Sequence, residues 1–376
     1  MYNHPISASV DHVTRSISSR SHVYTVEQYT TPVEAVAAVN HPGPPHFLVD
    51  RKVHGLFLEA TGTISTDRLL LIDATEATKS YGALEAIFLG LIEKGLKRSG
   101  SLAVVGGGVT QDIGCFISSV LARGVHWTYL PTTLLAQADS CIGSKSSINI
   151  GSYKNQIGTF YPPHRVLLVP DFLLTLPHDE IRSGLGEVIK LQLLCGEAGF
   201  RRLMTELGTL MSVAAADRIA LLAKWIQRSL DVKQPIIEAD EFDRGPRLLL
   251  NYGHTFGHAF ESSTQYAIPH GIAVILGVLA ATDVSVQLGL VDGDHSAELK
   301  RLLLPWHEPY ADKLRGVAIE DVLAAMSRDK KNQGSSLTCI LTGGFGRMER
   351  VQLSTDQVTA IVAPTLARLI ESGFTE

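Results

Sequence analysis

The stretch "LAVVGGGVTQDIG" (residues 102–114) runs from a short apolar segment through three glycines into a segment of helical composition. A strand that ends in a glycine turn and continues as a helix is typical of the phosphate-binding turn of an α/β domain. Glycine lets the backbone approach a pyrophosphate, whose charge would lie at the N-terminus of the helix. A plain strand-to-helix turn is the alternative that this stretch alone leaves open.

Short β-rich apolar runs alternate with helical stretches on both sides of this turn. The expected strands are "HFLVD" (46–50), "LLLID" (69–73), "LAVVG" (102–106), "VHWTYL" (125–130) and "RVLLV" (165–169). The helical stretches include "YGALEAIFLGLIEKGLKRSG" (81–100) and "DIGCFISSVLARG" (112–124). This alternation predicts a parallel sheet with crossover helices, as in a Rossmann-like α/β domain.

The pattern changes after Pro170, where the apolar residues follow a helical period. The stretches are "HDEIRSGLGEVIKLQLL" (178–194), "VAAADRIALLAKWIQRSLDVK" (213–233), "GHTFGHAFES" (253–262), "GIAVILGVLAATDVSVQLGL" (271–290) and "IEDVLAAMSRDKK" (319–331). We therefore expect a flexible tail over residues 1–22, an α/β domain over 23–170 and a mainly helical domain over 171–376.

The bulk composition restricts the class of protein. A chain of 376 residues is too long for one ordinary core, and 45% hydrophobic with 19% charged residues is typical of a soluble globular protein. The net charge of −5, without a basic run, argues against nucleic acid as a partner. The first 22 residues are rich in serine and lack the apolar core of a secretory signal, and we find no membrane span.

The four cysteines stand far apart and form no C-x-x-C pair. This usage predicts free thiols in a reducing compartment, and we expect a cytoplasmic protein.

A lysine-bearing stretch, "PTTLLAQADSCIGSKSSINIGSYKNQIGTFYPP" (residues 131–163), has an unusual distribution of charge. Asp139, Lys145, Lys154 and Asn155 lie among apolar and small residues and glycine or serine turns. Lysines in such turns suit phosphate as point-charge donors. Solvated loop lysines are the alternative.

Two histidines four residues apart stand in "LLLNYGHTFGHAFESS" (residues 248–263). Helical spacing places His254 and His258 on one face, so they are two metal ligands, one ligand with a catalytic imidazole, or packing residues. The metalloprotease motif requires a glutamate after the first histidine, where Thr255 stands. A metal site would need further ligands, and Glu187 on an apolar helix and His270 after a proline are the candidates.

Several blocks in order resemble the sugar-phosphate cyclases, best represented by 3-dehydroquinate synthase. Besides the glycine turn, they are "LARGVHWTYLPTTLLAQADSCIGSK", "KNQIGTFYPP", "SGLGEVIK", "LNYGHTFGHAFE", "PHG" and "RDKK", and they extend with gaps over residues 50–331. The resemblance implies the fold of that family, an α/β N-terminal domain and a mainly helical C-terminal domain. It also implies a homodimer that binds NAD and a divalent metal, Zn²⁺ or Co²⁺.

The resemblance also assigns roles to residues. It makes Glu187, His254 and His270 the metal ligands, with His258 beside the metal or facing phosphate. The implied NAD site comprises Asp50, Glu76, Lys79, Gly106, Gly107, Gly108, Asp112, Thr132, Thr133 and Asp139. The groups near the reacting carbons would be Arg123, Asp139, Lys145, Lys154, Lys190 and His258. The substrate would contact Lys145, Asn155, Lys233, Asp243, Arg247, Asn251, His258 and Lys331.

The implied reaction is the closure of a sugar phosphate into a carbocycle, with recycled NAD, phosphate elimination and an intramolecular aldol step. Lys233 and Arg247 occupy positions where family members that accept a 2-keto acid sugar hold its carboxylate, which favours 3-deoxy-D-arabino-heptulosonate 7-phosphate as substrate and 3-dehydroquinate as product. A specialised cyclase acting on an amino-substituted sugar phosphate, sedoheptulose 7-phosphate or glucose 6-phosphate is the first alternative.

A metal-dependent alcohol or glycerol dehydrogenase is the second alternative, because it shares the two-domain plan, but it would not need so many lysines.

Three positions depart from the pattern of the resembling family. Gln111 replaces the usual third glycine, Ser144 stands where a second glycine is common before Lys145, and Ile272 follows "HG" where an acidic residue is common. These changes mark either a specialised cyclase or neutral drift.

Overall fold

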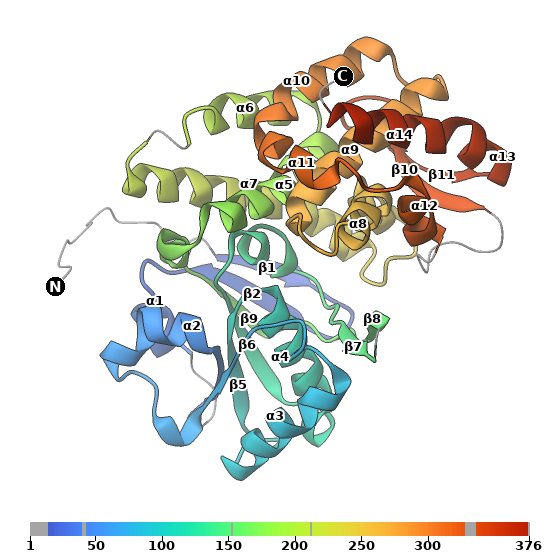
Figure 1. The fold of residues 1–376 in the computed structure, drawn as a ribbon. Helices are drawn as coiled ribbons and strands as arrows, with labels where there is room; N and C mark the ends of the chain where they lie inside the picture. The colour runs from blue at the N-terminus through green and yellow to red at the C-terminus, as the bar shows by residue number, and fades with distance from the viewer. Residues whose placement is uncertain (1–13, 40–42, 152, 211–212, 328–335, 375–376) are drawn as a thin grey trace. The chain divides into compact units, whose positions relative to one another are not determined.

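The computed structural model describes residues 14–39, 43–151, 153–210, 213–327 and 336–374 (Figure 1). They divide into two units, Met1–Thr175 and Leu176–Glu376, so the division falls five residues after the expected one. The first unit carries a sheet with helices, and the second is mainly helical, which confirms the expected fold class.

The N-terminal unit is built on a seven-stranded sheet with the order β1-β2-β9-β6-β5-β3-β4. Every neighbouring pair is parallel except β1 with β2. The strands are β1 (Thr14–Ser18), β2 (Val23–Gln28), β3 (His46–Asp50), β4 (Leu69–Ile72), β5 (Ser101–Gly106), β6 (His126–Pro131) and β9 (Arg165–Leu168). The five expected strands are confirmed. The expectation of a tail over 1–22 is wrong for residues 14–18, which form the edge strand β1.

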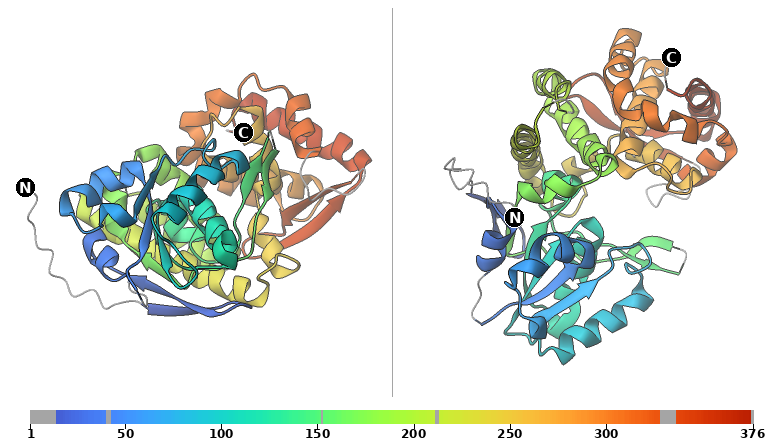
Figure 2. Two further views of the ribbon diagram at one scale, coloured as in Figure 1. Left: turned by 90° about the horizontal axis from the view of Figure 1, so that it is seen from below. Right: turned by 60° about the vertical axis from the view of Figure 1, so that its left-hand side comes forward.

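Helices cover both faces of this sheet (Figures 1 and 2). Ala103 and Val105 of β5 pack with α1 (Pro32–Ala37), whereas Val104 faces α4 (Gly108–Val120). Both faces of β5 are therefore buried, which explains its continuous apolar run. The remaining helical segments are α2 (Arg51–Val53), η1 (His54–Leu58), η2 (Glu59–Thr61), η3 (Thr66–Arg68), α3 (Tyr81–Glu93), η4 (Leu121–Arg123), η5 (Ala136–Ser140) and η6 (Pro170–Thr175).

A small hairpin of β7 (Ile148–Ile150) and β8 (Tyr153–Ile157) was not expected from the sequence. It interrupts the lysine-bearing stretch and carries Lys154 and Asn155. A bridge between Ser80 and Asn149 joins it to the start of α3. Of the predicted polar residues of this stretch, Lys154 and Asn155 therefore lie on the hairpin, whereas Lys145 precedes it and forms a bridge with Phe160.

The C-terminal unit is organised around α9 (His270–Gln287), which packs against α5 (His178–Cys195), α8 (His254–Ser263), α10 (Gly293–His307) and β10 (Leu337–Thr342). Among the described residues, α9 alone is long and apolar enough to cross a membrane, with a mean hydropathy of 1.5. Since 83% of it is buried, it is the core helix of this unit.

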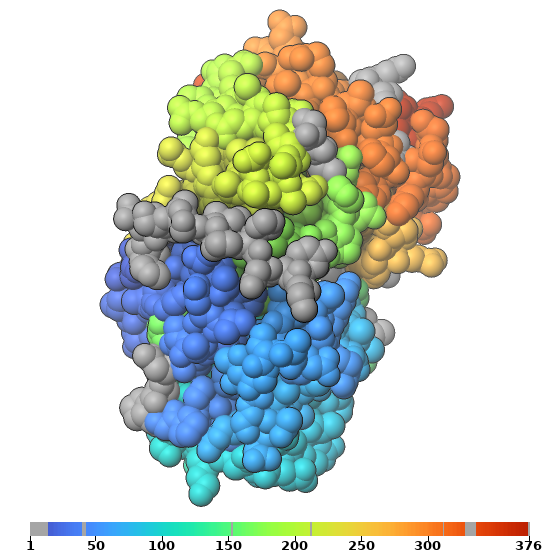
Figure 3. Space-filling model, turned by 90° about the vertical axis from the view of Figure 1, so that its left-hand side faces the viewer, coloured from blue at the N-terminus to red at the C-terminus, as the bar shows by residue number. Residues whose placement is uncertain are grey.

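Among its described residues, the rest of this unit comprises helices and one hairpin. The helical segments are α6 (Glu197–Leu207), α7 (Ala215–Ala239), η7 (Pro246–Asn251), η8 (Glu308–Tyr310), α11 (Ala311–Leu314), α12 (Ile319–Ser327), α13 (Thr355–Gln357), η9 (Val358–Val362) and α14 (Ala363–Ser372). The hairpin of β10 and β11 (Met348–Leu353) was not predicted. The outer surfaces of α6 and α7 appear as the yellow-green atoms of Figure 3.

Candidate active site

Glycines in the C-terminal unit let three helices approach closely. A Cβ atom at Gly186 of α5 would collide with the Gly271 carbonyl oxygen of α9, and one at Gly257 of α8 would lie 2.7 Å from the Ala273 carbonyl oxygen of α9. Real Cβ atoms are not found this close to backbone, so these crossings require glycine. The close packing brings side chains of α5, α8 and α9 to one place.

Glu187 of α5, His254 of α8 and His270 of α9 meet there. The Oε1 atom of Glu187 lies 2.9 Å from Nε2 of His270 and 3.3 Å from Nε2 of His254. One ligand atom from each residue lies within 4.8 Å of the others. Two imidazoles and a carboxylate are a ligand set that suits a divalent transition metal and leaves positions for substrate oxygens. The residues present therefore fit such an ion.

Lys190 sets the charge of this cluster. Its Nζ atom lies 2.5 Å from Oε2 of Glu187, and both side chains are buried. Burial would raise the pKa of Glu187, but the Lys190 ammonium and the two imidazoles hold that pKa well below its ordinary value. Burial and the Lys190 charge lower the pKa of His254. The carboxylate is therefore ionised and His254 is neutral near neutral pH, as a metal ligand requires.

The outer nitrogens of the two ligand histidines have acceptors. His254 Nδ1 lies 3.2 Å from the Tyr252 carbonyl oxygen, and His270 Nδ1 lies 3.2 Å from Oε2 of Glu261. Burial alone would lower the pKa of His270, but its contacts with Glu187 and Glu261 raise it to about 10.

The His258 ring belongs to the same cluster, with its centroid 5.2 Å from that of His254 and 5.8 Å from that of His270. The structure thus brings all three expected ligands, Lys190 and His258 together.

The glycine turn of the N-terminal unit has the expected form, with Gly106 ending β5 and Gly108 beginning α4. A side chain at Gly107 would lie 2.8 Å from the Thr133 methyl group, whereas Gly108 has open space around its Cα. The close contact of α4 with β5 occurs at Gly114, where a Cβ would lie 2.5 Å from Val104. Gly114, and not position 111, therefore allows helix and strand to approach.

Gln111, one of the three departures, is buried and has a defined role. Its Nε2 atom donates to the Ser140 carbonyl oxygen at 2.6 Å, and the Ser140 hydroxyl donates to its Oε1 atom at 2.5 Å. This pair of bonds ties α4 to η5, the turn that carries Asp139. The other two departures, Ser144 and Ile272, are buried.

Lys79 connects the expected cofactor residues. Its Nζ atom lies 3.2 Å from Asp112 Oδ2, 3.0 Å from Asn155 Oδ1 and 3.5 Å from Glu76 Oε1. Burial raises the pKa of Asp112, although Lys79 and Ser147 oppose this effect. Asn155, expected at the substrate phosphate, thus shares a network with Lys79 and Asp112.

Ser147 and Asn149 complete this network, and sequence reasoning missed both. The Ser147 amide and hydroxyl donate to Asp112, and its hydroxyl also lies 3.0 Å from Asn155 Oδ1. Asn149 donates to Glu76 at 2.9 Å and accepts from the Asn155 amide. Their positions within the lysine-bearing stretch were the available signal. Asn155 has a φ of 55°, a conformation that asparagine tolerates better than most residues.

The other expected cofactor residues are placed as follows. The Thr132 amide donates to the Gly106 carbonyl oxygen at 3.1 Å, and the Thr133 hydroxyl accepts from the Ala136 amide. The Asp50 side chain accepts from the Lys52 amide and caps α2, which is the role of a strand-end turn residue.

The residues expected at the substrate or near its reacting carbons come from both units. In the first unit, Lys145 and Arg123 are exposed and Lys154 is half-buried. In the second unit, Lys233 of α7 and Arg247 of η7 are buried, and these two elements pack against each other. The Arg247 guanidinium donates to the Glu241 carbonyl oxygen.

Three expected substrate residues remain. Asn251 donates to the Leu248 carbonyl oxygen, and Asp243 has a φ of 62°. Lys331 lies outside the described residues.

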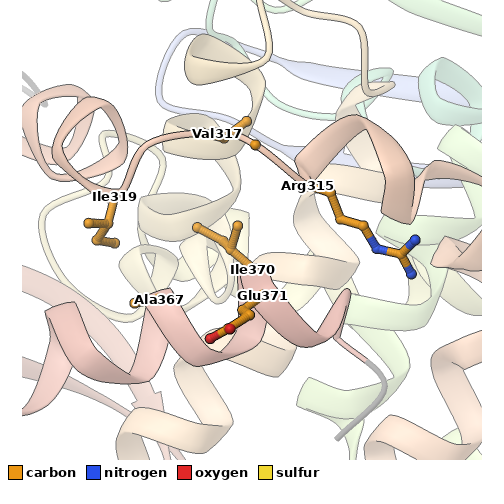
Figure 4. Close-up of a pocket in the computed structure, with 7 residues that line it drawn as sticks. Arg315, Val317, Ile319, Ala367, Ile370 and Glu371 are labelled. Carbon is orange, nitrogen blue, oxygen red and sulfur yellow. The ribbon is translucent and has the colours of Figure 1, made fainter.

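A pocket elsewhere in the C-terminal unit contains none of the expected site residues. It lies between the segment 315–319 and α14, and Figure 4 shows Ile370 and Glu371 on its α14 side. Its lining is mainly apolar, with the charged side chains of Arg315 and Glu371. Its lining residues come from other segments of the chain than the metal-ligand cluster and include no histidine.

Residues 69–183 match the family described as 3-dehydroquinate synthase N-terminal, and residues 184–332 match the one described as 3-dehydroquinate synthase C-terminal. The 3-dehydroquinate synthase of Alkaliphilus metalliredigens (strain QYMF) is 33% identical over 84% of this chain and 88% of that protein. The 3-dehydroquinate synthase of Xanthomonas oryzae pv. oryzae (strain PXO99A) is 38% identical over 75% of this chain and 76% of that protein.

Solved structures share the fold. The 2-epi-5-epi-valiolone synthase of Streptomyces hygroscopicus subsp. jinggangensis 5008, with NAD⁺ and Zn²⁺ bound, has a TM-score of 0.79 and 22% identity over 94% of this chain and 99% of that chain. A 2-deoxy-scyllo-inosose synthase complexed with carbaglucose-6-phosphate, NAD⁺ and Co²⁺ has a TM-score of 0.78 and 20% identity over 94% and 100%.

A probable glycerol dehydrogenase from Sinorhizobium meliloti 1021 is less similar, with a TM-score of 0.57 and 14% identity over 93% of this chain and 96% of that chain. The two family matches and the curated relatives agree with the ligand cluster and the glycine turn. The chain belongs to the 3-dehydroquinate synthase family.

Proposed function

We propose that this enzyme converts 3-deoxy-D-arabino-heptulosonate 7-phosphate into 3-dehydroquinate with release of phosphate. The observation that carries the proposal is the buried Glu187 carboxylate in contact with His254 and His270, in a chain whose curated relatives are 3-dehydroquinate synthases. These relatives are 33% to 38% identical over most of the chain, whereas the 2-deoxy-scyllo-inosose synthase and the 2-epi-5-epi-valiolone synthase are 20% and 22% identical.

The cofactor and the metal would be held by different units. The glycine turn, Thr132, Thr133 and the network of Lys79 and Asp112 would hold NAD, together with Asp50, Glu76 and Asp139. Glu187, His254 and His270 would hold Zn²⁺ or Co²⁺, the ions bound in the structural neighbours. When bound, NAD⁺ takes up and returns a hydride, and the divalent cation polarises an oxygen of the substrate.

The cations of the chain would bind and orient the anionic substrate. Lys145, Asn155, Asn251, His258 and Lys331 would contact the phosphate, and Arg123, Lys154 and Lys190 would lie near the reacting carbons. The Lys190 ammonium is already oriented by Glu187 at 2.5 Å. Such fixed donors stabilise charge as it develops, and much of the rate enhancement would come from positioning.

The buried Arg247 and Lys233 favour a carboxylated substrate. A guanidinium offers a planar fork that matches carboxylate geometry, and burial strengthens such a contact. Asp243, four residues before Arg247, completes this predicted carboxylate subsite. Sedoheptulose 7-phosphate, glucose 6-phosphate and amino-substituted sugar phosphates are the substrates that would not fill it, or would fill it differently.

A dehydrogenase would release NADH at every turnover. The cationic set argues against this alternative, because a small alcohol carries no phosphate and no carboxylate. Steady accumulation of NADH by the purified protein with a simple alcohol would favour the dehydrogenase.

A substrate panel tests the proposal. Phosphate release and product mass are measured for 3-deoxy-D-arabino-heptulosonate 7-phosphate, sedoheptulose 7-phosphate and glucose 6-phosphate, with Glu187→Ala as the inactive control. We expect turnover of the first substrate alone, with a product of the mass of 3-dehydroquinate and without net NADH. Turnover of a carboxylate-free substrate in its place would contradict the proposal.

We also propose that the protein is a cytoplasmic homodimer whose partner molecule is its sugar-phosphate substrate, not nucleic acid or membrane. Cys115, Cys141, Cys195 and Cys339 are free, which supports a reducing compartment. Light scattering after size-exclusion chromatography would give the oligomeric state, and fractionation of the source cells would give the location.

A further inference from the structure

Glu261 lies beside the metal-ligand cluster but is not one of the expected ligands. It stands on the last turn of α8, and its side chain is only 13% exposed. Its Oε2 atom lies 3.2 Å from Nδ1 of His270. On the other side of the same ring, Nε2 lies 2.9 Å from Oε1 of Glu187. The His270 imidazole is thus held between two carboxylates from two different helices.

The two ligand histidines differ in how their outer nitrogens are satisfied. His254 Nδ1 contacts a backbone carbonyl oxygen, that of Tyr252, at 3.2 Å. The corresponding contact of His270 Nδ1 is with a side chain, the Glu261 carboxylate. The residues that follow His270 in α9, Gly271 and Ile272, carry no carboxylate. The carboxylate therefore comes from α8.

Helix stability does not account for an acidic residue at this place. α8 ends at Ser263, so Glu261 lies in its last turn, where the partial negative charge of the helix disfavours a carboxylate. The contact with the His270 imidazole explains the presence of Glu261 better than the stability of α8 does.

We propose that Glu261 is a positioning residue of the metal centre. By accepting a hydrogen bond from Nδ1–H of His270, it orients the ring so that Nε2, once it has lost its proton, presents its lone pair to the site shared by the three ligands. Partners of this kind orient metal-binding imidazoles and increase their basicity, and their loss typically weakens metal affinity about 10- to 100-fold. This inference rests on the metal site of the proposed function.

Glu261 also lies next to His258. Ligand atoms of His258, Glu261 and His270 lie within 4.8 Å of one another, so the Glu261 carboxylate is close to both imidazoles. Because His270 Nε2 already faces Glu187, the Nδ1 side serves orientation and not a second ligand position.

The test compares full-length Glu261→Ala and Glu261→Gln with the wild type. Glutamine keeps an acceptor oxygen, whereas alanine removes it. Ser262→Ala, a change at the exposed neighbouring residue of α8, is the matched control. The dissociation constant for Zn²⁺ is measured by chelator competition, and the visible absorption of the Co²⁺ form reports ligand geometry. Circular dichroism and thermal unfolding of the metal-free proteins show whether each variant is folded.

We expect Glu261→Ala to weaken Zn²⁺ binding about 10- to 100-fold and to alter the Co²⁺ spectrum. Glu261→Gln should restore most of the affinity, and Ser262→Ala should match the wild type. Affinity and spectrum of Glu261→Ala within twofold of the wild type would overturn the inference, as would a glutamine variant no better than the alanine variant. Metal affinity is measured without turnover. If Zn²⁺ affinity depends on Glu261 but the enzyme rejects the proposed substrate, only the proposed function is contradicted.

Discussion

At the scale of single residues, the candidate site depends on the partners of Glu187. A carboxylate buried without a partner costs several kcal/mol, yet this one is ionised because Lys190, His254 and His270 surround it. Without a cation, the two imidazoles lie against Oε1 of Glu187 and the Lys190 ammonium lies 2.5 Å from Oε2. The same geometry presents Glu187, His254 and His270 to a metal.

The two histidines of α8 should behave differently when replaced. His254→Ala removes a ligand and should abolish stoichiometric binding of Zn²⁺, whereas His258→Ala should leave metal content near normal and slow phosphate release. Metal content of the purified variants, measured by mass spectrometry beside single-turnover phosphate release, checks this. Equal loss of metal in both variants would contradict the separate roles.

Replacement of Arg247 tests the carboxylate subsite. Arg247→Ala should reduce kcat/KM for the carboxylated substrate, with an increase of about 2–4 kcal/mol in the corresponding activation free energy, because the substrate carboxylate would be left unpaired in a buried place. Arg244→Ala, three residues earlier and exposed, is the control and should change kcat/KM little. An Arg247→Ala enzyme with unchanged kcat/KM would favour the carboxylate-free branch of the family.

At the scale of elements, the site is assembled by helix crossings. Gly186 of α5 and Gly271 of α9 meet backbone to backbone, and each lies next to a ligand, Glu187 or His270. A side chain at either position would force the two helices apart and separate those ligands.

Gly186→Ala should therefore destabilise the protein and weaken metal binding together. Overpacking of a tight contact typically costs about 1–3 kcal/mol. Gly293→Ala, at the start of α10 with open space around it, is the matched control and should be neutral or slightly stabilising. Thermal unfolding measures the loss of stability, and chelator competition measures the Zn²⁺ affinity. A Gly186→Ala protein with normal Zn²⁺ affinity would show that the close crossing of α5 and α9 is not needed for metal binding.

The sequence predicts some elements better than others for physical reasons. β3, β5, β6 and β9 are buried on both faces, so each appears as a continuous apolar run. β1 is an edge strand in which only Ile17 is buried, and its sequence looks like a polar tail. β7 has three residues and gives no usable periodicity.

The candidate site was predictable only in part. Spacing places His254 and His258 on one helix face, but the ligand cluster joins His254 to residues of two other helices. That convergence depends on the close crossing of α5, α8 and α9, which periodicity within one helix cannot measure. The resemblance of several motifs to the family identified the expected metal ligands, which spacing alone left open. Glu261 was missed because its partner His270 lies on a different helix and because Glu261 is not itself one of the expected ligands.

At the scale of the whole molecule, stability should depend on pH through His307. This residue ends α10, is buried, and within the described part of the chain has no hydrogen-bond partner for either ring nitrogen. Burial lowers the pKa of His307 to about 4. The unfolded chain, with an ordinary histidine pKa of about 6.5, binds this proton more readily, so stability is complete above that pH and falls as the pH approaches 4.

His307→Leu should remove this pH dependence. Between about pH 7 and about pH 5, the free energy of unfolding of the wild type should fall by about 2 kcal/mol more than that of the variant. Denaturant unfolding of both proteins at the two pH values measures the difference. Parallel pH profiles would show that His307 is not buried in its neutral form.

The proposed metal site requires that Glu187, His254 and His270 bind one divalent cation together. Anomalous diffraction at the cobalt absorption edge, from crystals grown with Co²⁺, tests it most directly. We expect a single strong peak about 2.0–2.2 Å from a carboxylate oxygen of Glu187 and from Nε2 of both histidines. A cobalt peak elsewhere in the chain, with these three side chains free of metal, would contradict the proposed metal site.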